Sequence, residues 1–451
     1  MENVPATENV QAEPGFFRQL AYAIGNFPVG LTSGVMSTWL MYYYCPPAEA
    51  GTVAYLSPAT FGLIMFLMNI PSALADPTVG HFSDRTRSRW GRRMPYIIFG
   101  TPIMVLSFIL MWYPPVQGIS TANTVWMTGT VLIYFLSFTA VVNPYLAIMP
   151  EVWQTVGGRM SVSSHMTVTQ GVGTLLAAAA TGAAISNFPK GVALAGIPLN
   201  GYTFVAILGA ILTVLGFLPT LFYIHETPYS ANKEVPFNLL RSGWETLKNP
   251  AFLPYLISIS LIGTSTTLII AMIPYQVRVM GGSTEDMAGY LMGALMLGAM
   301  FCLPLVNWLV TRIPRRTLFL ICCAGMSVII SFLYFPDAIP GLSPMIFMSV
   351  ILILSAPFVS VFLVVPRTLL ADVMDYDEQL TGYRREAMYN GMESLIGKVA
   401  TGLAPAIMGF LFTWYGNSSQ NPLGIRLCAV ASGVITILAF AAFLFYPLRN
   451  K

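Results

Sequence analysis

The sequence predicts an all-α integral membrane protein with twelve transmembrane helices in two six-helix bundles. Three observations lead to this fold class. Of the 451 residues, 55% are hydrophobic and only 9% are charged, whereas an average soluble domain has about 25% charged residues. Twelve apolar stretches each supply the roughly 20 residues that cross a bilayer. The longest polar segment between them, 225–250, divides these stretches six and six.

The predicted spans follow one another with mostly short loops between them. They cover residues 19–44, 55–82, 95–113, 122–148, 164–187, 200–224, 251–279, 286–310, 317–335, 344–371, 388–415 and 424–447. Residues 1–17 contain glutamates and lack an apolar core, so we expect a cytoplasmic tail rather than a signal peptide. The predicted domains are an N-terminal bundle over 18–224, a central cytoplasmic loop over 225–250 and a C-terminal bundle over 251–447.

The loop between the second and third spans predicts the orientation. Residues 84–93 carry five arginines, and loops rich in Lys and Arg stay in the cytoplasm. Both termini are then cytoplasmic, in what we expect to be the cell (inner) membrane. Only Lys190, Arg278 and Arg426 fall at outer ends, Lys398 falls within a span, and the other basic residues are assigned to the cytoplasm. The net charge of +3 reflects this orientation, and no nucleic-acid partner is expected.

A weak internal repeat supports two related halves. The turn Gly91-Arg92-Arg93 follows the second span, and the similar segment 311–316 with Arg315 and Arg316 follows the eighth. Matching basic turns after the second helix of each half indicate a duplicated bundle. Prolines inside several spans, among them Pro77, Pro144 and Pro366, are either ordinary kinks or the bends of helices that rock around a central site.

Asp76 is the first candidate for a functional group inside the membrane. It lies eight residues before Asp84, or about 12 Å below the interface at 1.5 Å per residue. An ionisable residue at depth costs at least about 2.5–3.5 kcal/mol, which makes it a functional candidate. Asn69 and Ser72 share its helix face at the i, i+3, i+7 spacing. The alternative is that Asp76 only caps the helix or pairs with a loop arginine.

The fourth span offers ligands that complete a cation site. Thr139 and Asn143 lie four residues apart on one face, and in an antiparallel neighbour they would approach the stripe that contains Asp76. Carboxylate, hydroxyl and amide oxygens are hard ligands that suit Na⁺, whereas a lone buried carboxyl suits a proton. We therefore expect H⁺ or Na⁺ as the coupling ion and no other cofactor or metal.

Lys398 is the basic counterpart of Asp76. It stands about ten residues into the eleventh span, or about 15 Å deep, too far to reach the interface easily. It needs a carboxylate, carbonyls or a substrate anion as partner, and Asp76 across the two halves is one candidate. Weaker candidates for substrate binding are His165, Gln170, Tyr275 and Gln276, since neutral polar residues often only bond helix to helix.

A mixed-charge segment follows the tenth span and predicts a cytoplasmic gate. Such clusters form salt bridges between the halves that stabilise one conformation; the alternative is a solvated loop. The predicted gate residues are Asp84, Arg85, Arg92, Arg93, Asp372 and Asp375.

Two long signatures in opposite halves resemble a known family. Asp76-Pro77-x-x-Gly80-x-x-x-Asp84-x-Thr86-Arg87-Ser88-Arg89-Trp90-Gly91-Arg92-x-x-Pro95 is the first; Ala371-Asp372-Val373-x-Asp375-Tyr376 with Arg385-Glu386-Ala387 is the second. Together they resemble the glycoside–pentoside–hexuronide:cation symporters of the major facilitator superfamily, over all twelve spans. The resemblance implies the major facilitator fold, a cation ligand at Asp76, a hydroxyl of the same site at Thr139 and the family's span-eleven lysine at Lys398.

The departures from this family concern the sugar pocket and the second acid of the cation site. Ser72 stands at the second acidic cation position and Ala75 at an intervening asparagine; the sugar-binding acids, a tryptophan and an arginine are replaced by Gly30, Val142, Leu146 and Thr167. Such a pocket loses charged hydrogen bonds to sugar hydroxyls.

These replacements shape the functional prediction. We predict a monomeric, non-enzymatic secondary transporter that moves a small glycoside-like solute with H⁺ or Na⁺ across the bilayer. The alternatives are a lysophospholipid transporter on the same fold and a membrane sensor that does not transport.

Overall fold

The computed structural model describes residues 15–188, 192–194, 197–224, 246–382 and 385–448. Most of the predicted tail and of the central loop 225–250, together with Lys190, lies outside these residues. The first half contains α1 (Phe16–Ala23), α2 (Asn26–Val35), η1 (Met36–Leu40), α3 (Met41–Tyr44), η2 (Ala48–Ala50), α4 (Pro58–Arg85), α5 (Met94–Leu110), α6 (Thr121–Val152), α7 (Val156–Asn187) and α8 (Gly201–Tyr223).

The second half repeats the pattern with six α-helices and two short helical turns. It contains α10 (Phe252–Tyr275), η3 (Gln276–Met280), α11 (Glu285–Val310), α12 (Arg315–Ser331), η4 (Phe332–Tyr334), α13 (Pro344–Thr381), α14 (Glu386–Tyr415) and α15 (Leu423–Phe443). Ten described helices are long and apolar enough to span a membrane, and α5 is a shorter apolar helix. The broken segment from α1 to α3 makes the twelfth span. The predicted twelve-helix membrane fold is confirmed.

Local sequence signals account for several helix starts. The hydroxyls of Ser57, Ser120 and Thr155 and the amide of Asn200 accept backbone N–H groups at the starts of α4, α6, α7 and α8. The first span is interrupted between α1 and α2, at Ile24 and Gly25. An unpredicted hairpin, β1 (Val192–Leu194) with β2 (Ile197–Leu199), follows α7. It adds two short antiparallel strands to an otherwise helical chain.

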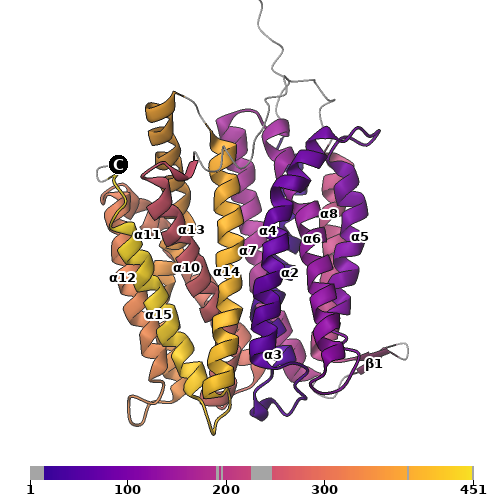
Figure 1. Cartoon of the computed structure of the whole chain (residues 1–451), viewed down its shortest axis with the longest axis vertical. Helices are drawn as coiled ribbons and strands as arrows, with labels where there is room; N and C mark the ends of the chain where they lie inside the picture. The colour runs from indigo at the N-terminus through magenta and orange to yellow at the C-terminus, as the bar shows by residue number, and fades with distance from the viewer. Residues whose placement is uncertain (1–14, 189–191, 195–196, 225–245, 383–384, 449–451) are drawn as a thin grey trace, which may run out of the picture.

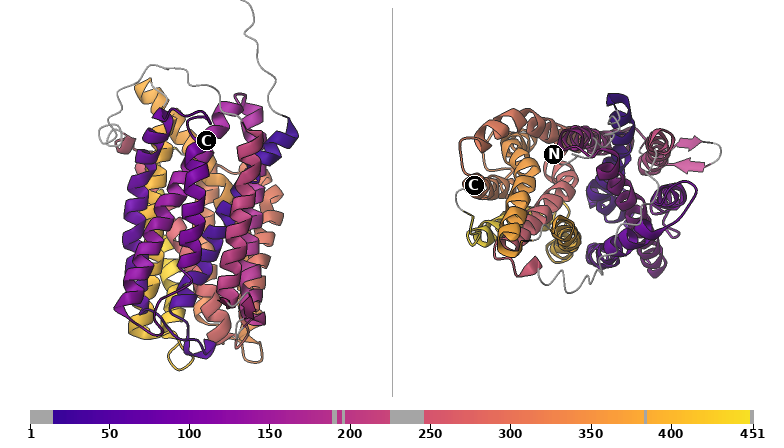
Figure 2. Two further views of the ribbon diagram at one scale, coloured as in Figure 1. Left: turned by 90° about the vertical axis from the view of Figure 1, so that its right-hand side faces the viewer. Right: turned by 90° about the horizontal axis from the view of Figure 1, so that it is seen from above.

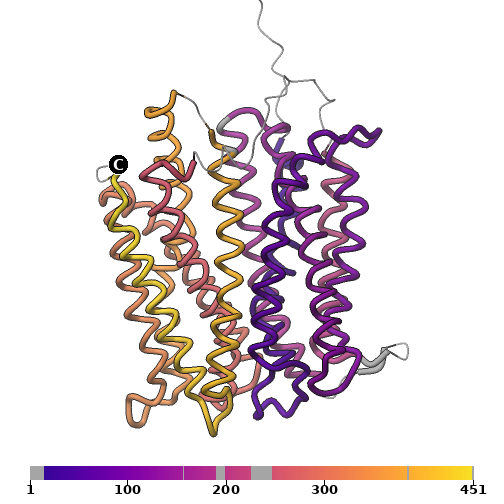
Figure 3. Tube along the Cα trace, viewed as in Figure 1, coloured from indigo at the N-terminus to yellow at the C-terminus, as the bar shows by residue number. Residues whose placement is uncertain are grey.

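The two halves lie side by side and meet along two seams (Figures 1 and 2). At one seam α4 packs on α14, and at the other α7 packs on α11. Figure 3 traces α4 and α14 next to each other at the centre of the molecule. These pairs are the second with the eleventh span and the fifth with the eighth. Exchanging the halves converts one seam into the other, as expected for a duplicated bundle.

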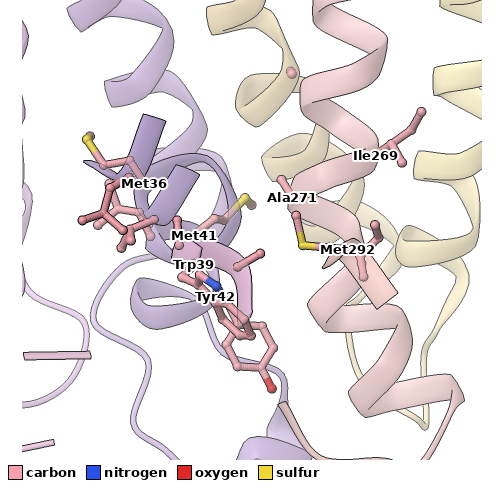
Figure 4. Packing of buried hydrophobic residues seen from close by; sticks show 14 of the residues in the cluster. Met36, Trp39, Met41, Tyr42, Ile269, Ala271 and Met292 are labelled. Carbon is pink, nitrogen blue, oxygen red and sulfur yellow. The ribbon is translucent and has the colours of Figure 1, made fainter. Parts of the chain in front are cut away.

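Corresponding irregularities reinforce the relation between the halves. The first span contains the π-helical turn Met36–Leu40, and the seventh contains Gln276–Met280. Both turns lie towards the end of the molecule opposite the arginine-rich loop, where α10 also contacts η1 and α3. The buried core is continuous here: Figure 4 shows Met36, Trp39 and Tyr42 of the first span on one side and Ala271 and Met292 of α10 and α11 on the other.

Candidate cation and substrate site

Asp76 and Lys398 form an ion pair across the α4–α14 seam. The Lys398 ammonium donates to Oδ1 of Asp76, as the sequence suggested for these two residues. Both side chains are largely shielded, with 11% of the Asp76 side chain and 27% of the Lys398 side chain exposed. The alternative partner for Asp76, an arginine of the following loop, is not the one found. Opposite charges at this depth compensate for each other's loss of hydration.

Hydroxyl and amide groups complete the surroundings of this pair. Asn143 donates to Oδ1 of Asp76 at 3.0 Å, and the Lys398 ammonium also donates to the Thr139 hydroxyl at 3.2 Å. The Thr139 and Ser72 hydroxyls lie 3.3 Å apart. Four of the five predicted cation-site residues therefore lie in one cluster with Lys398. Their oxygen atoms are the ligands that a hard cation such as Na⁺ prefers.

Ser394 belongs to the cluster and was missed by the sequence analysis. Its hydroxyl donates to Oδ2 of Asp76 at 2.9 Å. The available signal was spacing: Ser394 precedes Lys398 by four residues on α14, so both side chains face α4. Ser and Thr are common in membrane helices, and spacing to a lysine alone does not distinguish a ligand from a helix contact.

Asn69 does not join the cluster. Its side-chain amide donates to the carbonyl of Met65 on its own helix at 2.8 Å. It instead lies against Gly402, where a Cβ would come within 3.1 Å of the Asn69 side chain. Gly402 thus lets α14 approach α4 closely, one turn beyond Lys398. The shared face with Ser72 and Asp76 is correct, but in this structure Asn69 packs rather than coordinates.

Two predicted substrate residues of α7 lie towards helices of their own half. Gln170 accepts a hydrogen bond from Asn26 of α2 at 3.2 Å. The ring of His165 packs edge-on against Phe16, with 5.4 Å between the ring centres. Neither residue contacts Asp76 or Lys398 directly in the part of the chain described. Their roles as substrate contacts stay predictions.

The two predicted substrate residues of the seventh span are buried at the outer end. Tyr275 donates its hydroxyl to the carbonyl of Cys45 at 2.9 Å, and Gln276 donates to the carbonyl of Leu333 at 3.1 Å. Only 2% of Gln276 is exposed. In this conformation both side chains hydrogen-bond to backbone carbonyls of other segments. Neutral polar residues in a membrane often make such structural bonds rather than contact a substrate.

A group of cross-half contacts, here called the outer latch, surrounds Tyr275. It consists of Tyr42, Cys45, Glu49, Tyr275, Arg278, Glu285, Asn417 and Ser419. Tyr42 donates to the Glu285 carboxylate at 2.8 Å, and Arg278 donates to the carbonyl of Glu49 at 2.6 Å. Glu49 in turn accepts the backbone N–H of Ser419 at 2.6 Å. These bonds join the outer ends of the two halves.

Hydrogen bonding outweighs burial at Glu49. Loss of hydration opposes ionisation, but the hydrogen bonds from Ser419 and the nearby Arg278 guanidinium place the pKa of Glu49 below its usual range. The carboxylate is therefore charged at neutral pH and available to the latch.

The predicted gate residues make ion pairs within each half. In the first half, Arg92 and Arg93 pair with Glu151, and Arg93 also pairs with Asp84 at 2.8 Å. In the second half, Arg315 pairs with Asp372 at 2.7 Å.

These ion pairs lie within each half, and the salt bridges expected between the halves stay a prediction. Each set ties the start of the third helix of a half to the fourth helix. Arg85 and Asp375 remain predicted gate residues.

The chemistry available at the seam is electrostatic and exchangeable. The carboxylate and the neutral oxygens can bind a monovalent cation or a proton in place of the ammonium. The described residues contain no group of three His, Cys, Asp or Glu that could hold a metal ion. Two helical halves, a charged pair on the seam and a latch at one end define a membrane transporter of the major facilitator type.

Comparison with known proteins identifies the family. The model of the MFS/sugar transport protein family matches residues 21–450. The chain belongs to this family, and its resemblance to the glycoside–pentoside–hexuronide:cation symporters is confirmed.

Individual relatives differ in how much of the chain they match. The glucuronide carrier protein homolog of Escherichia coli (strain K12) is 24% identical over 96% of this chain and 92% of its own length. The sodium-dependent lysophosphatidylcholine symporter 1 of Gallus gallus is 32% identical over 169 residues, which cover 36% of this chain and only 30% of that protein. The nucleoside transporter NupG has a similar structure, with a TM-score of 0.67 at 12% identity over 95% of this chain and 98% of that one. That likeness concerns the fold alone.

Proposed function

We propose that this protein is a cation-coupled symporter of a small solute, with Asp76 as the cation-binding group. The observation that carries this proposal is the Asp76–Lys398 pair across the seam. A cation or proton that neutralises Asp76 competes with the Lys398 ammonium for the same carboxylate. Occupation of Asp76 therefore loosens one link between α4 and α14. This gives the cation a direct influence on how the halves pack.

Both H⁺ and Na⁺ fit the residues around Asp76. Na⁺ would use the Asp76 carboxylate with the Thr139, Ser72 and Asn143 oxygens, a neutral set with a single negative charge. A proton needs only the carboxylate. The single acid makes the proton a stronger candidate than in relatives with two acids.

A glycoside-like solute is the first candidate substrate. The full-length similarity to a glucuronide carrier homolog supports it. A lysophospholipid is the second candidate. Over the 169 residues that match, this chain is 32% identical to a lysophosphatidylcholine symporter, against 24% over nearly the whole chain for the glucuronide carrier homolog. In addition, Gly30 and Val142 replace acids of the family's sugar pocket. Uptake of a labelled panel containing both classes, with and without a proton uncoupler or Na⁺, decides between them.

The proposed setting is the cell (inner) membrane, with a monomer whose termini face the cytoplasm. The end of α15 lies at the same end of the molecule as the arginine-rich loop after α4 (Figure 1), and loops of that charge resist translocation. A C-terminal tag should therefore resist protease added outside intact cells and be cleaved after permeabilisation. Cleavage in intact cells contradicts the topology.

Asp76→Asn tests the coupling role. The variant keeps the size of the side chain but cannot bind a cation by charge. We expect it to lose accumulation against a gradient while retaining exchange of solute across the membrane. Full concentrative uptake by Asp76→Asn refutes the assignment. Asn69→Ala on the same helix face is the matched control, and it should keep coupled uptake because Asn69 does not contact the cluster.

A further inference from the structure

Arg367 is an arginine near the cytoplasmic end of the tenth predicted span, in the second half. It lies inside α13, five residues before Asp372, which pairs with Arg315 at the start of α12. At 1.5 Å per residue Arg367 is about 7.5 Å deeper than that cytoplasmic pair. It lies within the predicted span 344–371, four residues before the cytoplasmic end of that span, although the sequence analysis assigned it to the cytoplasm.

The guanidinium of Arg367 differs from those of Arg315 and Arg385 in its hydrogen bonds. Arg315 donates to both oxygens of Asp372, and Arg385 donates to both oxygens of Asp377. Arg367 is exposed and forms no hydrogen bond or ion pair with any residue that the structure describes. Its planar fork of donors is therefore available for a ligand with paired oxygen atoms.

Two titratable groups on other helices interact electrostatically with Arg367. They are the Glu393 carboxylate of α14 and the Tyr255 hydroxyl of α10. Tyr255 is fully buried and donates to the carbonyl of Pro366, the residue before Arg367. The Oε2 atom of Glu393 is buried without a hydrogen-bond partner among the described residues. Arg367 and Glu393 therefore interact electrostatically, with no hydrogen bond or ion pair between them among the described residues.

Glu393 also relates this pair to the cation site. It immediately precedes Ser394, which bonds to Asp76, and it lies five residues before Lys398 on α14. The helix places Glu393 about 7.5 Å nearer the cytoplasm than Lys398. Because consecutive residues point about 100° apart, Ser394 faces α4, whereas Glu393 points away from it and interacts with Tyr255 of α10.

We propose that Arg367 binds an anionic group, a carboxylate or a phosphate, of the transported solute, and that Glu393 is the internal counter-ion which this group displaces electrostatically. This deepens the proposed transport function and rests on it. Bidentate binding of carboxylate or phosphate is the chemistry to which arginine is best suited. A solute held here lies on the cytoplasmic side of the Asp76–Lys398 pair, so cation and solute occupy separate, neighbouring places. The transporter then selects charged over neutral members of a substrate class.

Equilibrium binding to the full-length protein in lipid nanodiscs, without any ion gradient, tests the proposal. Methyl glucuronide is compared with methyl glucoside, and lysophosphatidic acid with monoacylglycerol, so the two arms distinguish a carboxylate from a phosphate. We expect the anionic member of one pair to bind about tenfold to a hundredfold more tightly, the range for a charged hydrogen-bonded pair. Arg367→Ala should abolish that preference and leave the neutral member unchanged. Equal binding of anionic and neutral members by the native protein overturns the proposal.

Two further variants keep the test decisive if Arg367→Ala fails to fold. Glu393→Gln removes the counter-ion, so it should strengthen binding of the anionic member and leave the neutral one unchanged. Arg312→Ala removes an arginine that lies over Trp308 at the cytoplasmic end of α11 and should change neither. If Glu393→Gln alters both members equally, the carboxylate has only a structural role and the proposal fails. Asp76→Asn should lose coupled uptake but keep the preference for the anionic member, whereas Arg367→Ala should lose that preference. These two results separate this proposal from the coupling mechanism.

Discussion

The ion pair between Asp76 and Lys398 should have a measurable interaction energy that depends on the coupling cation. We consider Asp76→Asn, Lys398→Gln and the double variant. Removing either charge leaves the other at depth among neutral groups, whereas removing both leaves two amides that can bond to each other. The two single changes should therefore cost more in sum than the double change.

The expected size follows from the exposure of the two groups. A fully buried pair that loses one partner costs about 3–5 kcal/mol, and a fully exposed pair contributes about 0–1 kcal/mol. With 27% of the Lys398 side chain and 11% of the Asp76 side chain exposed, the coupling energy should fall between these limits, at about 2 kcal/mol. Two further donors, Asn143 and Ser394, stay with Asp76 in Lys398→Gln and keep the value below the buried limit.

Unfolding of the four purified proteins in the same detergent, measured in denaturant, gives the cycle. The coupling energy should shrink as Na⁺ is raised or as pH is lowered, whichever supplies the coupling ion, because that ion replaces the ammonium beside Asp76. The same cycle on Arg385 and Asp377, a pair within one half, is the control and should not respond to Na⁺. Changes that add within about 0.5 kcal/mol refute the assigned interaction. A coupling energy unaffected by either ion refutes competition at Asp76.

Two further predictions concern the outer ends of the halves. A Cβ at Gly62 would lie 2.4 Å from the carbonyl oxygen of Pro405 on α14, so Gly62→Ala should push α4 from α14 at a cost of about 1–3 kcal/mol. In a chain whose other cysteines are removed, a maleimide that cannot cross membranes should then label Cys45 of the outer latch faster. Gly80→Ala is the control and should leave labelling at the native rate, because the space around Gly80 is open. Equal rates in both variants contradict the packing argument. Because the pKa of Glu49 is lowered in the folded protein, its stabilisation is present above about pH 4.3, the ordinary glutamate pKa, and is lost as pH falls through the lowered value. Distances between spin labels at the outer ends should lengthen below that pH in the native protein and stay constant in Glu49→Gln; a native protein with no pH response contradicts this prediction.

Charge within apolar sequence is what allowed the central pair to be predicted. Asp76 and Lys398 stand in long hydrophobic stretches, where the cost of an ionised group leaves few explanations other than mutual pairing or a ligand. Neutral groups carry no such penalty, so Ser394 was not predicted. The substrate roles of Tyr275 and Gln276 stay predictions; here these side chains bond to the carbonyls of Cys45 and Leu333.

Helix ends were the other source of error. Hydropathy reports where the chain leaves the hydrocarbon and not where the helix stops, so α13 was ended ten residues before Thr381. The cytoplasmic gate between the halves stays a prediction. Ion pairs at the cytoplasmic end depend on the conformation, and a sequence that specifies two conformations does not say whether Asp372 meets Arg315 or an arginine of the other half.

The division of the proposed cation site between the halves determines what a bound cation could do. A ligand shifts a conformational equilibrium only as far as its affinity differs between the two states. Asp76, Ser72, Thr139 and Asn143 all belong to the first half and can move together, so they alone would bind a cation equally well in every conformation. Lys398 and Ser394 come from the second half and leave or approach as the halves move. We infer that Lys398 makes cation affinity depend on conformation. Coupling should therefore be more sensitive to the charge at Lys398 than to any one of the neutral oxygens.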